Sequence, residues 1–270
     1  MSRLFSWLLV ADASLLAIAG GLGPPPASLG LDPFYKKWLD ADGLPIVASE
    51  RVPDAALAEA RRLLLKMCEK RRDCFEAIRT SPARIRVAIL AESELTTDIP
   101  EYRDLAPKDY WDKRARGLGA TTERPAVSGA EENLLAYPSD RYRGESIFIH
   151  EFAHTFAQFG AAAREPGFGE KLKAAYDDAM KKGLWKGTYA AENPDEYWAE
   201  GVQSWFDANL EGAAAGLDAA APRKTKNAIH NDVDTRDELK RYDPALAALI
   251  ASVMPDDEWR YAPPSAPAPR

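Results

Sequence analysis

The pattern of apolar and polar positions predicts a protein with both helices and strands. Residues 54–68 alternate apolar and charged side chains at helical spacing and are rich in Ala, Leu and Arg, which favour a helix. Residues 84–90 alternate charged with branched apolar side chains, which is typical of a strand. A shorter apolar run, Leu134–Tyr137, precedes Pro138 and predicts an edge strand. Because helices and strands do not alternate regularly, the expected class is α+β rather than a doubly wound sheet.

Three further helices are predicted in the second half of the chain. The run Glu145–Phe159 is apolar on more than one face and precedes Gly160, a residue type that often ends a helix. A second helix is expected over residues 169–182. A third begins at Asn193-Pro194, since Asn can cap a helix and Pro suits its first turn.

The two ends of the chain differ in composition from its centre. Residues 1–19 join a basic residue to an apolar run that closes on Ala-x-Ala, which predicts a secretory signal peptide, although Asp12 opposes insertion. The alternative is an amphipathic helix of a cytosolic protein. Residues 20–30 contain three consecutive prolines and predict a linker, and the Pro- and Ala-rich residues 261–270 predict a disordered tail. Residues 31–260 then form one domain of a secreted or periplasmic protein, which we expect to be monomeric.

The only two cysteines, Cys68 and Cys74, follow the first predicted helix. In one continuous helix their backbones would lie about 9 Å apart, which is too far for a disulfide. A break over residues 70–73 would bring them together. For an exported chain we expect a disulfide between them, and for a cytosolic chain two buried thiols.

Composition excludes two classes of partner. The 270 residues carry a formal net charge of −7, so the chain lacks the positive field that nucleic acid binding requires. No segment is long and apolar enough for stable insertion into a membrane once a signal peptide is removed. The 46% of hydrophobic residues allows a sizeable core.

Candidate metal chemistry comes from two of the three histidines. His150 and His154 lie one helical turn apart, so their imidazoles project from one face and can bind a single metal ion. Glu151 is rotated from His150 by about 100°, so it can reach a water on that ion without being a ligand. This H-E-x-x-H spacing is typical of hydrolases that hold one catalytic Zn²⁺. The alternative is a pair of core histidines that bond to neighbouring polar groups.

A catalytic zinc site needs a third protein ligand and an open position. The candidates are six downstream carboxylates: Glu165, Glu170, Glu192, Asp195, Glu196 and Glu200. Glu196 fits best because it lies in the first turn of the helix that Asn193 caps. Glu200 follows one turn later on the same face, where it can accept the free N–H of a ligating histidine. In the alternative interpretation, Glu196 only forms a capping box with Asn193. The remaining histidine, His230, is expected to have a capping or surface role.

The segments HEFAH and GTYAAENPDEYWAE resemble the lethal-factor-like zinc endopeptidases. This gluzincin family includes the catalytic domain of anthrax lethal factor and the secreted Pro-Pro endopeptidases. In that family a tyrosine precedes the ligand glutamate by seven residues, as Tyr189 precedes Glu196 here. The resemblance implies a zincin-like fold, in which a small mixed sheet accompanies a helix carrying H-E-x-x-H and a downstream helix carrying the third ligand. It also implies residue roles: zinc ligands His150, His154 and Glu196, general base Glu151, supporting carboxylate Glu200 and oxyanion-stabilising phenol Tyr189.

We therefore expect a secreted zinc metalloendopeptidase whose Glu151 assists a zinc-activated water in hydrolysing a peptide or protein substrate. One alternative is a zinc hydrolase that acts on a non-peptide amide or ester, such as a cell-wall or polysaccharide component. Another is a catalytically silent binding module that zinc stabilises. Glu151 argues against the silent module, because a structural zinc site needs no base and normally has a fourth protein ligand.

Overall fold

The computed structural model describes residues 21–209 and 230–264. Their single mixed sheet contains, in spatial order, β1 (Lys37–Ala41), β2 (Leu44–Ala48), β3 (Arg86–Leu90) and β4 (Ala126–Ala130). β1 and β2 are antiparallel, whereas β2, β3 and β4 run parallel to one another. This confirms the α+β class, and β3 confirms the strand predicted at residues 84–90.

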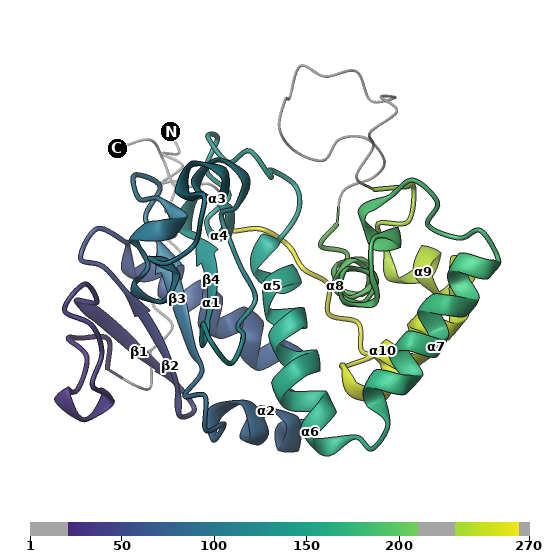
Figure 1. Cartoon of the computed structure of the whole chain (residues 1–270), viewed down its shortest axis with the longest axis horizontal. Coiled ribbons are helices and arrows are strands. Elements are labelled where there is room, and N and C mark those ends of the chain that lie inside the picture. The colour runs from purple at the N-terminus through teal and green to yellow at the C-terminus, as the bar shows by residue number, and fades with distance from the viewer. Residues whose placement is uncertain (1–20, 210–229, 265–270) are drawn as a thin grey trace, which may run out of the picture.

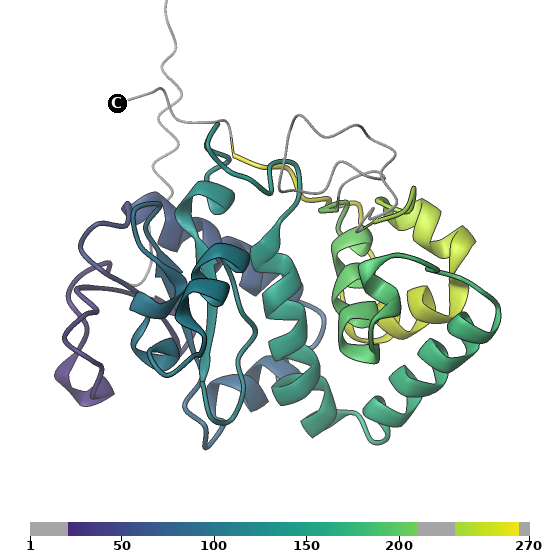
Figure 2. The same cartoon turned by 45° about the horizontal axis from the view of Figure 1, so that its top comes forward.

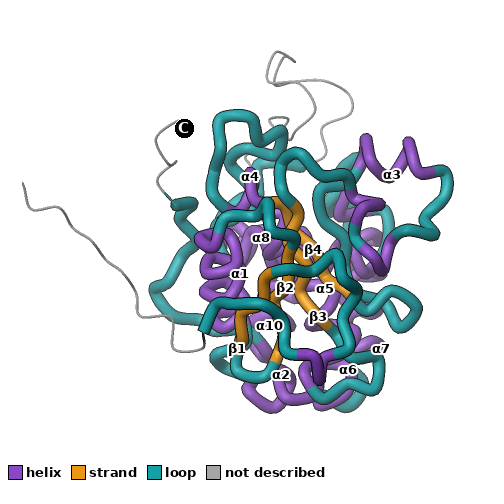
Figure 3. The backbone as a smooth tube through the Cα atoms, turned by 90° about the vertical axis from the view of Figure 1, so that its left-hand side faces the viewer, coloured by secondary structure: helices purple, strands orange, loops and turns teal. Residues whose placement is uncertain are grey.

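The central strand β3 is buried on both faces, and its side chains alternate between them. Alternate residues of β3 therefore belong to two separate hydrophobic clusters. Val87 and Ile89 belong to the larger cluster, and Ala88 and Leu90 to the smaller one. The larger cluster receives side chains from α1 (Asp54–Met67) and α2 (Arg72–Arg79). Figure 3 shows α1 on one side of the sheet and α3 (Lys108–Arg114) on the other.

A group of helices lies beyond the sheet, and α5 (Ile147–Thr155) stands between the two parts in both Figure 1 and Figure 2. α5 approaches β4 closely, since a Cβ at Gly129 would lie 3.1 Å from the Phe148 ring. On the opposite side the Trp198 indole donates a hydrogen bond to the Ala153 carbonyl at 2.9 Å. The helices on that side are α7 (Phe168–Lys181), α8 (Pro194–Trp205), α9 (Arg236–Tyr242) and α10 (Pro244–Val253).

The strand predicted at Leu134–Tyr137 is wrong. Residues Glu131–Leu134 form the short helix α4, and Ala136 has a φ of 53°, which a strand does not allow. A run of four apolar residues fits a buried turn as well as a strand, so periodicity alone could not separate the two. β4 is one of the two edge strands of the sheet, and part of its outer edge is covered because the Ser128 N–H donates to the Leu118 carbonyl at 2.9 Å.

The sequence predicts that the helix beginning with α5 ends at Gly160, and this prediction is wrong. The helix continues through the π-helix Phe156–Ala161 into α6 (Ala162–Arg164). Gly160 instead allows close packing on α2, since a Cβ there would lie 3.2 Å from the carbonyl oxygen of Cys74. The other predicted helices are confirmed as α1, α7 and α8.

Residues 96–119, between β3 and β4, are polar and contain prolines, so the sequence predicts a long irregular segment, and this prediction holds only in part. It contains the short 3₁₀ turns Thr96–Asp98 and Pro100–Tyr102, and then α3. After α3 the chain runs without regular structure to β4 and passes directly over α5. This connection therefore brings residues of α3 and the following loop to the same helix as the predicted metal ligands.

The break predicted between the cysteines is present, since α1 ends at Met67 and α2 begins at Arg72. Cys68 and Cys74 are nevertheless both buried free thiols, so the disulfide expected for an exported chain is not formed. Burial raises the pKa of Cys74 to about 11, which keeps this thiol protonated and unreactive at neutral pH.

The predicted signal peptide at residues 1–19 lies outside the described part of the chain. Within the predicted linker, Gly23 exchanges two backbone hydrogen bonds with Trp38 of β1, at 3.1 and 2.7 Å. Tyr261, the first residue of the predicted tail, is buried, and its N–H donates to the Phe206 carbonyl at 2.7 Å. Among the described helices none is long and apolar enough to span a membrane.

Candidate metal centre

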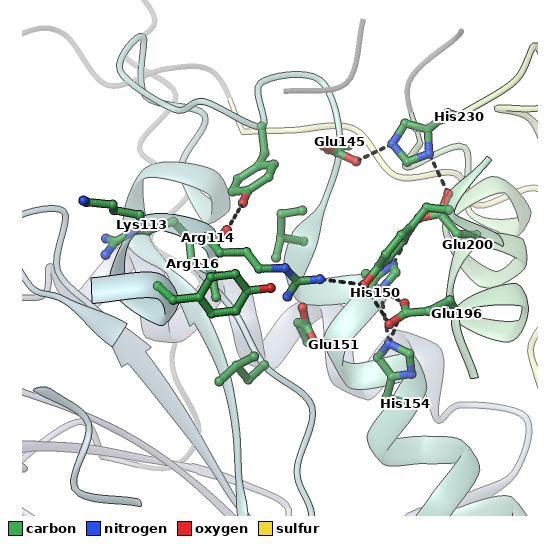
Figure 4. A pocket seen from close by; sticks show the side chains of 17 residues that line it. Lys113, Arg114, Arg116, Glu145, His150, Glu151, His154, Glu196, Glu200 and His230 are labelled. Carbon is green, nitrogen blue, oxygen red and sulfur yellow. Dashed lines mark hydrogen bonds and ion pairs between the residues drawn. The ribbon is translucent and has the colours of Figure 1, made fainter. Parts of the chain in front are cut away.

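Three metal-ligating atoms converge where α5 packs against α8 (Figure 4). His150 Nε2 lies 3.1 Å from His154 Nε2 and 3.0 Å from Glu196 Oε2. His154 Nε2 lies 3.3 Å from the same carboxylate oxygen. Ligands that surround one tetrahedral zinc ion at about 2.0 Å lie about 3.3 Å from one another. The predicted ligands are therefore brought together in an arrangement that suits a single metal ion.

Local sequence sets where the two helices that carry these ligands begin. The Ser146 hydroxyl caps α5 by accepting a hydrogen bond from the Ile149 N–H at 3.3 Å. On α8, the Asn193 side chain accepts from the N–H groups of Asp195 and Glu196, both at 2.9 Å. Because Asn193 caps the helix and the Glu196 carboxylate points toward the histidines, the interpretation of Glu196 as a capping residue is wrong.

Gln203 on α8 fixes the orientation of His150. Its amide nitrogen donates to the Ser146 carbonyl at 3.2 Å, so its Oε1 faces His150 Nδ1 at 2.8 Å. Nδ1 must then carry the proton, which leaves a lone pair on Nε2 for a metal ion. Glu200, which was predicted to play this part, is farther from Nδ1 at 3.5 Å. Helical periodicity could have indicated Gln203, since it lies seven residues after Glu196 on one helix face.

The centre has an electronegative environment that favours a cation. Burial disfavours charge on His150, but the hydrogen bond to Glu196 and the charges of Glu151 and Glu200 outweigh it and raise the pKa of His150 to about 10. Burial likewise disfavours charge on Glu196, yet hydrogen bonds to His150 and His154 lower the pKa of its carboxyl. Surroundings that stabilise positive charge on an imidazole also suit a divalent ion in its place.

Glu151 lies beside the ligands without belonging to them. Burial raises the pKa of its carboxyl above the ordinary value, which makes its carboxylate a stronger base. Two glycines of the preceding loop pack against this turn of α5. A Cβ at Gly117 would lie 2.9 Å from Glu151 Cγ, and one at Gly119 would lie 2.9 Å from His154 Cβ. Glycine at both positions thus lets the loop lie directly on the metal-binding helix.

Tyr189 lies at the mouth of the centre, on the short 3₁₀ turn Tyr189–Ala191 that precedes α8. Its hydroxyl donates to Glu196 Oε1 at 2.8 Å and accepts a hydrogen bond from Arg114 Nη2 at 3.1 Å. Burial and the charge of Glu196 raise the pKa of the phenol, so it stays protonated and remains a donor at neutral pH. Sequence patterns did not indicate Arg114, because its helix α3 lies within residues 96–119, for which an irregular segment is predicted.

The structure overturns the capping or surface role expected for His230. This residue is buried, with Nδ1 at 2.6 Å from Glu200 Oε2 and Nε2 at 3.2 Å from Glu145 Oε2. Burial disfavours charge on His230, but the two carboxylates outweigh it and raise its pKa to about 10. His230 is therefore a buried cation between two acids, and Glu200 connects it to the surroundings of His150.

Replacing His230 by Ala is expected to lower the free energy of unfolding by about 3–5 kcal/mol, because it leaves two buried carboxylates without their cation. Urea unfolding of both proteins at the same saturating zinc concentration measures the difference. His230→Gln keeps a donor for Glu200 and is expected to lose less. A loss below about 1 kcal/mol for His230→Ala would show that the pair with Glu200 and Glu145 contributes little.

A cavity of about 450 Å³ opens over the centre. The metal-ligating residues line one side, and Lys113, Arg114 and Arg116 line the other (Figure 4). Glu151 and Tyr189 also line the cavity. Its volume lies in the range of pockets that hold small molecules or a few side chains. The candidate metal site is therefore open to a substrate rather than sealed by protein.

Comparison with known proteins assigns no family. No family model matches the chain. A segment of 124 residues is 28% identical to valine–tRNA ligase from Pyrobaculum aerophilum, which covers 45% of this chain and 16% of that enzyme. The chain thus corresponds to a small fraction of that relative's length, and so partial a match does not transfer the relative's activity.

Proposed function

We propose that this protein is a zinc-dependent metallopeptidase with a zincin-like catalytic domain. The observation that carries the proposal is the set of His150, His154 and Glu196, whose ligating atoms converge beside Glu151 at the floor of an open cavity. Catalytic zinc sites commonly have three protein ligands and one open position, and two histidines with a glutamate are a known zinc set. The motif resemblance to lethal-factor-like endopeptidases supports the same conclusion.

The donor set fits zinc, since two imidazoles and one carboxylate are ligands that this ion prefers. A zinc ion bound there would lower the pKa of a coordinated water to about 7 and polarise a substrate carbonyl. The hydrogen bond from His150 Nδ1 to Gln203 prepares Nε2 for binding, as described above. The protein would supply the remaining steps with its own side chains.

In the proposed reaction, Glu151 accepts a proton from the water that attacks the peptide carbonyl carbon. The same carboxyl then delivers this proton to the amide nitrogen as the C–N bond breaks, which gives a free carboxylate and an amine. Tyr189 turns its single O–H from Glu196 Oε1 to the carbonyl oxygen as that oxygen gains negative charge. The raised pKa of the phenol keeps this donor available at neutral pH.

Replacing Tyr189 by Phe is expected to lower kcat by about 10²–10³-fold with little change in KM, because the lost donor acts mainly on the transition state. Steady-state kinetics on a cleaved peptide measures both constants. The matched control is Tyr176→Phe on α7, whose hydroxyl bonds to the Ala191 carbonyl outside the cavity. Equal effects of Tyr189→Phe on kcat and KM would instead assign Tyr189 to substrate positioning.

The proposed function is tested by metal analysis followed by digestion of a peptide library, with products identified by mass spectrometry. We expect about one zinc ion per chain and peptide cleavage that a chelator stops and added zinc restores. Parallel assays on wall polymers and simple esters distinguish a peptidase from a zinc hydrolase with non-peptide substrates. Bound zinc without turnover of any of these substrates would favour a silent binding module.

A further inference from the structure

One cationic side chain reaches the metal centre without a carboxylate partner. Arg114, the last residue of α3, extends across the cavity so that Nη2 lies 3.1 Å from Tyr189 Oη (Figure 4). A guanidinium group has five N–H donors, and this contact uses one of them. Within residues 21–209 and 230–264, the observed ion pairs include none for Arg114.

The neighbouring basic residues, Lys113 and Arg116, do not present a free positive charge to the metal ligands. Arg116 is neutralised by Glu132, with Nε and Nη2 at 2.6 and 3.1 Å from its two carboxylate oxygens. The Arg116 guanidinium also donates to the Ala91 carbonyl at 3.0 Å, so it holds the loop in place. Figure 4 shows the Lys113 ammonium pointing away from the metal ligands. Among the described basic residues that line the cavity, Arg114 is thus the one that presents a charged fork to the centre.

The charges around Arg114 indicate that it affects which substrates bind. The other side of the cavity carries the carboxylates of Glu151, Glu196, Glu200 and Glu145. His230 neutralises part of the charge of Glu145 and Glu200, and Glu196 would bind the metal, so Glu151 is the carboxylate left to repel an acidic substrate. A fixed cation where the substrate carboxylate binds would offset that repulsion. A guanidinium is suited to that task, because its planar fork can form two parallel hydrogen bonds to one carboxylate.

We propose that Arg114 binds a carboxylate of the substrate next to the scissile bond, so that the enzyme prefers acidic peptides. This inference rests on the proposed peptidase function and specifies its substrate class. The carboxylate belongs either to an Asp or Glu side chain or to the free C-terminus of the peptide. Both sources offer the same chemistry to the guanidinium, and amidated peptides separate them.

The test uses the zinc-loaded full chain and four matched forms of a peptide that it cleaves. They carry Glu or Gln beside the cleaved bond, each with a free or an amidated C-terminus. We expect kcat/KM to be about 10- to 100-fold higher for a form that offers the recognised carboxylate than for its neutral twin. Arg114→Gln should abolish that ratio, because it lowers kcat/KM for the acidic form much more than for its neutral twin, and Arg114→Lys should retain part of it. Lys113→Gln removes the same charge from the preceding residue and should leave the ratio intact.

Two results overturn the inference while leaving the peptidase proposal standing. In the first, the wild-type protein cleaves acidic and neutral twins with equal kcat/KM. In the second, Arg114→Gln slows all four forms alike, which would make Arg114 a residue that only positions Tyr189. By contrast, a zinc-loaded wild type that cleaves no peptide overturns the proposed function itself. Zinc content and circular dichroism of each variant show whether it has kept its fold and metal.

Discussion

Replacing Glu151 by Gln is expected to lower kcat by about 10²–10⁴-fold while the zinc content of the protein stays unchanged. The amide keeps the size of the side chain but cannot accept a proton from the attacking water. Glu151 lies one residue after His150 on α5 and does not belong to the converging ligand atoms, so the metal should stay bound. Metal analysis and steady-state kinetics on the same preparation measure both quantities.

The matched control for this change is Glu170→Gln in the first turn of α7. Glu170 is an exposed glutamate and was a candidate third ligand by sequence, so the same chemical change there should alter neither zinc content nor kcat. Full activity of Glu151→Gln would falsify the role of Glu151 as the general base. Loss of zinc from Glu151→Gln would instead indicate that its carboxylate supports the metal ligands.

Replacing Glu196 by Ala is expected to weaken zinc binding by more than about 100-fold and to abolish turnover. Loss of an outer partner of a ligand already costs about 10- to 100-fold in affinity, and Glu196 supplies a ligand oxygen itself. Helix α8 should persist, because Asn193 rather than Glu196 caps its first turn. Competition with a chromophoric chelator gives the zinc affinity, and circular dichroism confirms the helix content.

Asp195→Ala is the control for this experiment, since Asp195 is exposed and lies next to Glu196 in the same helical turn. It removes one acidic side chain from the start of α8 without touching the ligand set, and zinc affinity should stay within a few-fold of the wild type. If Glu196→Ala bound zinc as tightly as Asp195→Ala does, another group would have to complete the site.

Much of the candidate site follows from local sequence, because helical periodicity acts over a few residues. The spacing of His150 and His154 requires both imidazoles on one face of a helix, and the structure confirms this. The Asn193-Pro194 start likewise places Glu196 in the first turn of α8. Sequence alone made Glu196 a candidate ligand. The packing of α5 against α8 then brings its carboxylate to the two histidines.

Predictions from local patterns were wrong where the same short run of residues is compatible with two different local structures. Leu134–Tyr137 is apolar enough for a strand, but its residues lie in a helix end and a turn. Gly160 fits a helix stop, yet the helix continues there because glycine allows close contact with α2. In both cases packing against distant segments outweighed the local preference.

The sequence by itself determined the helix that carries His150, Glu151 and His154, and the start of the helix that carries Glu196. Only the tertiary structure decided that Gln203 rather than Glu200 bonds to His150, that His230 is buried between Glu145 and Glu200, and that Arg114 faces Tyr189. Most of these contacts join residues that are far apart in the chain. Their geometry depends on how whole helices pack, which no short-range periodicity encodes.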